Sequence, residues 1–252
     1  TTDRSWFTRG REIWQGTPGG PAERVHALQT EGRISELSPN GSDSGLALML
    51  SVADMFKRLV YVDLASGEET ICREGNRHLG HLQMCPTRDD WIMFADQHDA
   101  ANWQRMYTVL TNGREHFPFY AQHKGEWVTH ECWTRDGKHV TFTRHPEGLC
   151  MVDANGENVR LVRAGDYWHG QGGRSGALLA ADQWHGEVHL IRGADGACQA
   201  LTEAWTEGGK WIPQGPLHSH PCLSQREQAV AHVDGRTGLA RVRIYELAPL
   251  HW

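Results

Sequence analysis

The 252-residue sequence lacks a long apolar run, since no stretch reaches the roughly 18 apolar residues that a membrane-spanning helix requires. Its first segment, TTDRSWFTRGREIW, lacks both the basic start and the apolar core of a secretion signal. We therefore expect a protein that does not enter a membrane and that works in the cytoplasm.

Cysteine and basic charge are also scarce. The six cysteines form no CxxC motif and no closely spaced pair, so we expect reduced thiols, as in a cytoplasmic protein. The formal net charge of −6 at pH 7 argues against a nucleic-acid-binding protein, which normally presents a basic face. The 16 histidines count as neutral in that balance, so mild acid would make the surface more positive.

An apolar period of 3.6 residues is absent, which excludes a helical solenoid. Instead, a unit of about 40–50 residues recurs, with a polar strand, a turn of the Ser-Pro-Asp-Gly type, two apolar strands and a glycine turn. The first turn occurs at 38–41, 85–88, 134–137, 173–176 and 224–227. The apolar strands that follow read LALML, WIMFAD, HVTFTR, ALLAAD and AVAHVD. Hairpin turns that require positive φ are predicted at Gly67, Gly113, Gly156 and Gly196.

About four strands per unit at this period are typical of the blades of a β-propeller. Five full units are visible, preceded by a partial unit at residues 5–14. The sequence therefore predicts an all-β protein, a β-propeller of four-stranded antiparallel blades, formed as a single domain over residues 1–252.

Four histidines occupy one position of this repeat. The residue four places before each turn is Ile34, His81, His130, His169 or His220. Because the first strand of each blade lines the channel of a propeller, we expect these rings to converge on one small volume. Neutral imidazoles are natural ligands for a divalent ion such as Mn²⁺ or Zn²⁺, so the pattern predicts a metal site. The histidines outside this phase are interpreted as structural, namely His26, His98, His116, His145, His189 and His251.

His218 and His220 form an H-x-H pair, whose rings would point to the same face of a strand. Together with His169 from the preceding unit they supply three ligands. Gln214, four residues before His218, is either a fourth ligand through its amide oxygen or a loop residue.

His130 is the candidate general base, because a neutral imidazole accepts a proton readily near pH 7. Glu131 is expected to face the opposite side of the strand, where it would orient a neighbour or form a buried pair. Arg105 lies in the largely apolar segment 103–107. It is either a surface cation on an edge strand or a cation directed into the site, where it would bind a carboxylate bidentately.

At these residues the sequence resembles the oligogalacturonate lyases, a family of propeller enzymes, and the resemblance extends over residues 31–248. The phrases that carry it are Gly80-His81-Leu82-Gln83, Gln104-Arg105-Met106, Thr129-His130-Glu131 followed by Trp133, and His218-Ser219-His220-Pro221. The Ser-Pro-Asp-Gly turn itself is shared with TolB-like propellers.

The resemblance implies a metal-dependent lyase for an acidic oligosaccharide. Its ion would be Mn²⁺, with Zn²⁺ and Ca²⁺ as alternatives. The implied ligands are His169, His218 and His220, and Gln214 is the candidate for the fourth. The resemblance further implies that His130 removes the C5 proton of a uronate with Arg105 as its partner, while the C4 oxygen leaves. His81 is assigned to substrate binding.

The chain departs from the family in three ways. The family glutamine lies closer to the H-x-H pair, at the position of Gly215, and the turn at 172–176 differs. The family is seven-bladed, so the resemblance implies that up to two blades are lacking on the N-terminal side. Two other functions stay open: a non-catalytic TolB-like or WD40-like propeller that serves as a protein-interaction module, and a metal-dependent hydrolase or lyase for another acidic sugar.

Overall fold

The computed structural model describes residues 4–54, 56–76, 79–96, 104–204, 219–235 and 239–247. Within these ranges the protein is all-β, as the sequence predicts, and its strands form six antiparallel sheets. No helix in the described part of the chain is long and apolar enough to cross a membrane. The chain divides into two compact units, 1–124 and 125–252.

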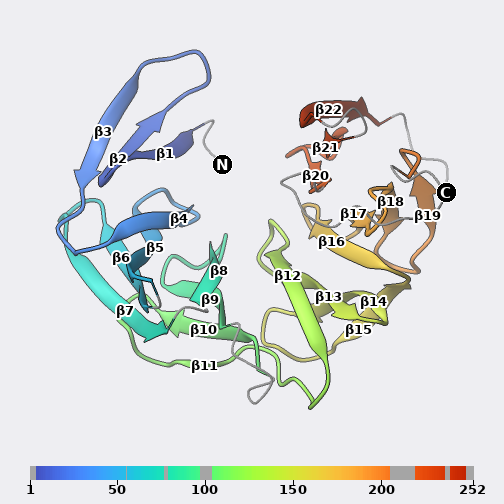
Figure 1. The fold of residues 1–252 in the computed structure, drawn as a ribbon, viewed down its shortest axis with the longest axis horizontal. Coiled ribbons are helices and arrows are strands. Elements are labelled where there is room, and N and C mark those ends of the chain that lie inside the picture. The colour runs from blue at the N-terminus through green and yellow to red at the C-terminus, as the bar shows by residue number, and fades with distance from the viewer. Residues whose placement is uncertain are drawn as a thin grey trace. The chain divides into compact units, whose positions relative to one another are not determined.

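The first unit contains one three-stranded and two four-stranded sheets, and within each sheet the strands that follow one another in sequence pair (Figure 1). Its strands are β1 (Ser5–Arg9), β2 (Glu12–Gly16), β3 (Ala22–Ala27), β4 (Arg33–Pro39), β5 (Gly45–Ala53), β6 (Phe56–Asp63), β7 (Glu69–Asn76), β8 (Leu79–Met84), β9 (Trp91–Asp96), β10 (Met106–Leu110) and β11 (Phe117–Pro118). The sheet β1–β3 accounts for the partial unit in the sequence.

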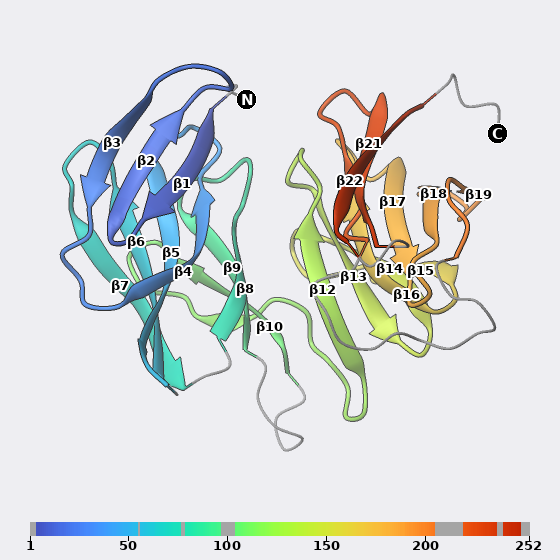
Figure 2. The ribbon, with the colours of Figure 1, turned by 45° about the horizontal axis from the view of Figure 1, so that its top comes forward.

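The second unit repeats the same pattern with two four-stranded sheets and one three-stranded sheet (Figure 2). Its strands are β12 (Trp127–Trp133), β13 (His139–His145), β14 (Gly148–Asp153), β15 (Arg160–Ala164), β16 (Tyr167–Gly172), β17 (Leu178–Gln183), β18 (Val188–Arg192), β19 (Cys198–Ala200), β20 (Cys222–Leu223), β21 (Ala229–Asp234) and β22 (Arg241–Glu246). Each sheet is a meander, which is the topology of a propeller blade.

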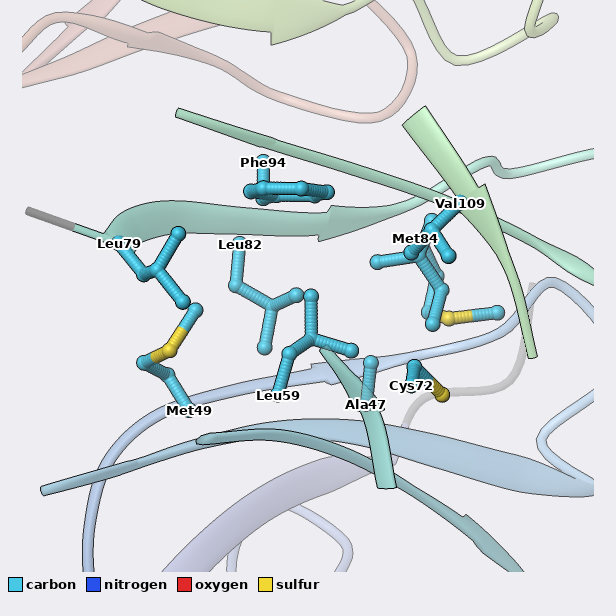
Figure 3. Close-up of a cluster of buried hydrophobic side chains, with 10 residues drawn as sticks. Ala47, Met49, Leu59, Cys72, Leu79, Leu82, Met84, Phe94 and Val109 are labelled. Atoms are coloured by element: carbon cyan, nitrogen blue, oxygen red, sulfur yellow. The ribbon is translucent and has the colours of Figure 1, made fainter. Parts of the chain in front are cut away.

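The hydrophobic core lies between neighbouring sheets of each unit. In the first unit, Leu79 and Leu82 of β8 point toward Met49 of β5 and Leu59 of β6 (Figure 3). All four side chains are almost fully buried. Each such burial contributes about 1.5–3 kcal/mol, so the contact between sheets is a major source of stability. The second strands β5, β9 and β17 read as nearly continuous apolar runs because both of their faces are covered.

The predicted hairpin glycines adopt φ values between 71° and 81°, at Gly67, Gly113, Gly156 and Gly196. Gly41 serves a different purpose, because its φ is not left-handed. A Cβ atom at Gly41 would stand 2.1 Å from the carbonyl oxygen of Pro86. The absence of a side chain there lets the turn after β4 pack against the turn after β8.

Candidate functional site

The first strands of four sheets carry a β-bulge at or next to the repeat position of the phased histidines. The register shifts between Ile34 and Glu36 in β4, Gly80 and Gln83 in β8, Thr129 and Cys132 in β12, and Tyr167 and His169 in β16. Bulges are over-represented beside active sites because they redirect a side chain. The repeat therefore contains a backbone irregularity where the sequence places its histidines.

Three of the phased histidines have a left-handed backbone, with φ of 52° at His81, 55° at His130 and 40° at His220. This region costs an L-residue about 1–2 kcal/mol, and it persists where the surrounding structure enforces it, often at functional sites. The sequence predicts regular strands through His130 and His220. Instead, His130 lies within a bulge and His220 precedes β20, so simple strand alternation does not decide where these rings point.

In the second unit, His130, His169 and His220 lie side by side. The ring centroids of His130 and His169 are 4.1 Å apart, and those of His169 and His220 are 3.8 Å apart. His169 is buried, His130 is half-buried and His220 is exposed. We call these three residues the histidine cluster, and His220 makes it accessible to solvent.

Asp182, near the end of β17, organises the histidine cluster. Both of its carboxylate oxygens lie 3.0 Å from His169 Nδ1, and one of them accepts the His169 backbone amide at 2.7 Å. The other accepts the backbone amide of His220 at 3.2 Å. The Asp182 side chain is almost fully buried, where a carboxylate requires such donors. One carboxylate thus fixes the ring of His169 and the backbones of both histidines.

No motif in the sequence marks Asp182 as part of the site. The available signal was an aspartate that ends the second strand in three units, as in WIMFAD, ALLAAD and AVAHVD. These residues are Asp96, Asp182 and Asp234, and all three are buried. The repeat shows the shared position, but it does not show that Asp182 meets a histidine.

The donor chemistry of the histidine cluster fits a divalent metal ion. A carboxylate behind Nδ1 selects the tautomer in which Nε2 carries the lone pair, which is how metal-ligating histidines are commonly held. The His220 ring is close enough to share an ion with His169. The other two predicted ligands, His218 and Gln214, lie outside the described residues. Within the described ranges alone, no three His, Cys, Asp or Glu side chains are grouped to hold a metal.

In the first unit, His81 and Arg105 lie together. Arg105 Nη2 is 3.4 Å from both ring nitrogens of His81. Arg105 directly precedes β10, and its backbone is held on both sides. Its amide donates to Gln122 Oε1 at 2.5 Å, and its carbonyl accepts the amide of Asp96 at 2.8 Å. The guanidinium therefore extends from a fixed backbone beside a half-buried histidine.

Three of the histidines interpreted as structural contact residues outside the histidine cluster. His26 Nε2 lies 2.7 Å from Glu69 Oε1, and His189 Nδ1 lies 2.8 Å from the Tyr167 hydroxyl. The His116 ring stacks on Tyr107 with centroids 5.0 Å apart. His145 lies instead among tryptophans. His98 and His251 lie outside the described residues.

Comparison with known proteins finds lyases among the relatives of this chain. An oligogalacturonate lyase of Dickeya dadantii is 27% identical over 174 residues, which are 64% of this chain and 39% of that protein. An oligogalacturonide lyase of Pectobacterium atrosepticum is 34% identical over 91 residues, 35% of this chain and 23% of that protein. The matched segments thus span less than half of either relative. No protein-family model matches the chain.

A solved oligogalacturonate lyase in complex with manganese has the same fold, with a TM-score of 0.81 over 98% of this chain and 74% of that chain, at 17% identity. The chain is thus similar to oligogalacturonate lyases in part of its sequence and in its fold. Its fold is a β-propeller. Two of the phrases that carry the family resemblance, Gly80–Gln83 and Thr129–Glu131, lie at the bulges of β8 and β12.

Proposed function

We propose that this protein is a metal-dependent lyase that cleaves oligogalacturonate by β-elimination. The observation that carries the proposal is the histidine cluster held by the buried carboxylate of Asp182, in a chain that is similar to oligogalacturonate lyases. A similar solved lyase is in complex with manganese, which supports Mn²⁺ as the ion.

His169 and His220 would hold the ion from the described part of the chain, with His218 and Gln214 as the other two proposed ligands. When bound, the ion supplies Lewis-acid chemistry that polarises the uronate carboxylate and acidifies the adjacent C5 proton. Asp182 would keep the His169 ring in the ligating orientation through its contact with Nδ1.

His130 would accept the C5 proton on its imidazole. The electrons of the C5–H bond form the C4–C5 double bond as the bond between C4 and its oxygen breaks. The released oxygen takes up a proton and becomes the reducing-end hydroxyl of one product, and the other product carries a 4,5-unsaturated uronate. A positioned imidazole contributes about 10²–10⁴-fold to the rate of such a proton transfer.

Arg105 is proposed as the partner of the base, and His81 as a substrate-binding residue. A guanidinium binds a carboxylate through two parallel charge-assisted hydrogen bonds, so Arg105 is suited to a uronate that gains negative charge. Stabilisation of charge where it develops is usually the largest share of catalysis. The contact between His81 and Arg105 supports a joint role in holding the acidic sugar.

The test combines metal analysis with an ultraviolet assay for the unsaturated product. We expect wild-type protein to bind Mn²⁺ stoichiometrically and to form unsaturated product from oligogalacturonate. His169→Ala and His218→Ala should lose the metal. His130→Ala should keep the metal and lose activity by about 10²–10⁴-fold. The control is His116→Ala, an exposed histidine outside the histidine cluster, which should keep both properties.

Two results would contradict the proposal in different ways. Absence of bound metal after incubation with Mn²⁺ would exclude the ligand assignment and favour a non-catalytic propeller that binds other proteins. Bound metal without product from oligogalacturonate would keep the metal site and point to another acidic sugar.

A further inference from the structure

Four aromatic side chains of the second unit form a cluster that the proposed chemistry does not use. Trp127 of β12 and His145 of β13 are cross-strand partners with ring centroids 4.5 Å apart. Trp168 of β16 and Trp184, which follows β17, have centroids 3.9 Å apart. The two pairs meet, because the His145 ring lies 5.6 Å from each of these tryptophans. We call these four residues the aromatic shelf.

The local backbone explains why Trp168 joins this group. In β16, Tyr167 pairs with Gln183 and His169 pairs with Asp182, so Trp168 is the extra residue of the bulge. The side chain of a bulged residue does not follow the alternation of its strand. The Trp168 ring therefore lies beside Trp127 of the neighbouring sheet, at a centroid distance of 6.0 Å. The bulge at His169 thus also places Trp168 on the shelf.

The aromatic shelf is not part of the hydrophobic core. The Trp127 side chain is 52% exposed, and the other three members are half-buried. Tryptophan dominates the energetics of interfaces because it combines a large apolar face with one polar group. Contiguous apolar patches at the surface commonly mark interaction sites or ligand-binding grooves.

The charge around the shelf indicates what it binds. None of its members is a lysine or an arginine. The adjacent Arg144 is engaged by Glu147 at 2.6 Å and by Glu126 at 3.6 Å. Burial lowers the pKa of His145, which favours a neutral ring at neutral pH. The shelf therefore offers uncharged aromatic surface, with Trp127 as its most exposed member, and such surface matches the apolar C–H face of a sugar ring better than a carboxylate.

The shelf is continuous with the histidine cluster. The Trp168 ring lies 4.4 Å from His130 and 5.8 Å from His169, centroid to centroid. A chain of sugars whose reacting uronate lies at His130 would therefore meet the shelf with one of its neighbouring rings.

We propose that the aromatic shelf is a subsite that binds a further pyranose ring of the oligosaccharide through its C–H face. This inference rests on the proposed function, which supplies the identity of the substrate. The shelf recognises a ring face and not a carboxylate, so it should accept a methyl-esterified galacturonate as readily as the free acid.

Binding to galacturonate oligomers of increasing length tests the subsite. Mn²⁺-loaded His130→Asn protein, which lacks the proposed base, is titrated calorimetrically with di-, tri- and tetragalacturonate. We expect one step in length to tighten binding about tenfold, which corresponds to one good aromatic contact. Adding Trp127→Ala or Trp184→Ala should abolish that step, whereas Trp127→Phe should largely retain it. The matched control is Trp91→Ala, a half-buried tryptophan in the first unit, which should leave the step intact.

The possible results separate the two proposals. A step in affinity that survives both tryptophan-to-alanine changes would overturn the subsite, as would failure of every oligomer to bind. A step that both changes abolish, in a protein whose wild type yields no unsaturated product, would support the subsite and refute the lyase. Circular dichroism of each variant verifies folding, and the exposure of Trp127 makes its truncation the safer of the two.

Discussion

In each unit, one carboxylate accepts hydrogen bonds from the irregular backbone beside the phased histidines. Glu36 Oε2 accepts the amide of Leu82 at 2.7 Å, immediately after the left-handed His81. Asp182 does the same for the amides of His169 and His220. A bulge removes a residue from the ladder of backbone hydrogen bonds, and its amide then needs another acceptor. In both units a buried or half-buried acid provides that acceptor.

Asp182→Asn is predicted to weaken Mn²⁺ binding about 10–100-fold, the usual effect of removing a carboxylate behind a ligating histidine. The amide is isosteric, but it does not favour the same His169 tautomer. Calorimetric titration with Mn²⁺ measures the change. Asp234→Asn is the control, because Asp234 is buried at the same position of its repeat and pairs with Arg243 at 3.2 Å. Equal losses in both variants would indicate general destabilisation instead of a role behind the ligand.

At the scale of elements, the turns between strands help to join neighbouring sheets. Asn40 is buried in the turn after β4, and its side-chain oxygen accepts the amides of Ser44 at 2.9 Å and Gly45 at 3.2 Å. Gly41 beside it allows the backbone of Pro86 to approach. Close packing thus requires a glycine at position 41, whereas a positive φ favours glycine in the hairpin turns.

Gly41→Ala is predicted to destabilise the protein by about 1–3 kcal/mol, the cost of overpacking a site whose neighbour is backbone. Urea unfolding measures the change. Gly20→Ala is the control: its φ is also outside the left-handed range, and the nearest atom to its new Cβ is the hydroxyl of Thr17, which can rotate away. A loss at Gly20 as large as that at Gly41 would show that contact between the two turns is not the cause.

Several carboxyl groups make the stability of the whole protein depend on pH. Hydrogen bonds hold the pKa below its ordinary value at Glu12 beside Arg24, at Asp63 beside Ser66, and at Asp195 beside Arg192, where it falls to about 2. Burial alone would raise the pKa of Glu69, but hydrogen bonds from Thr30, Gln29 and His26 outweigh burial and lower it. Folding thus favours the ionised form of each carboxyl group. Each group therefore contributes stability that is fully present above its pKa in the unfolded state and is lost as pH falls through its pKa in the folded state.

Glu69→Gln is predicted to cost about 1–3 kcal/mol near neutral pH, because Glu69 of β7 accepts three hydrogen bonds from the end of β3 and the segment after it. The difference in unfolding free energy between the variant and wild type should shrink as pH falls below 4.5, the ordinary pKa of a glutamate. Wild-type Glu69 then becomes protonated and loses its charge, as the glutamine has none. Urea unfolding across acidic pH measures it. Glu68→Gln, an exposed neighbour, is the control. A difference that does not change with pH would exclude the carboxylate charge as its source.

Much of the fold was predictable because its signals are local. The repeat, the hairpin glycines and the apolar second strands correspond to the six sheets that the structure describes, and the partial unit at 5–14 belongs to the sheet β1–β3. A single domain over residues 1–252 stays a prediction. The shared repeat position of the histidines was also predictable, because it needs only a count of residues back from each turn.

The strands, the turns and the shared repeat position of the four phased histidines follow from the sequence alone. The bulges at His81, His130 and His169, the place of Asp182 behind His169, and the contact of Trp168 with Trp127 of the neighbouring sheet follow only from the folded protein. A strand pattern specifies only the alternation of side chains along one segment. A bulge depends on the register between two strands, and the contacts around it depend on which sheets pack together.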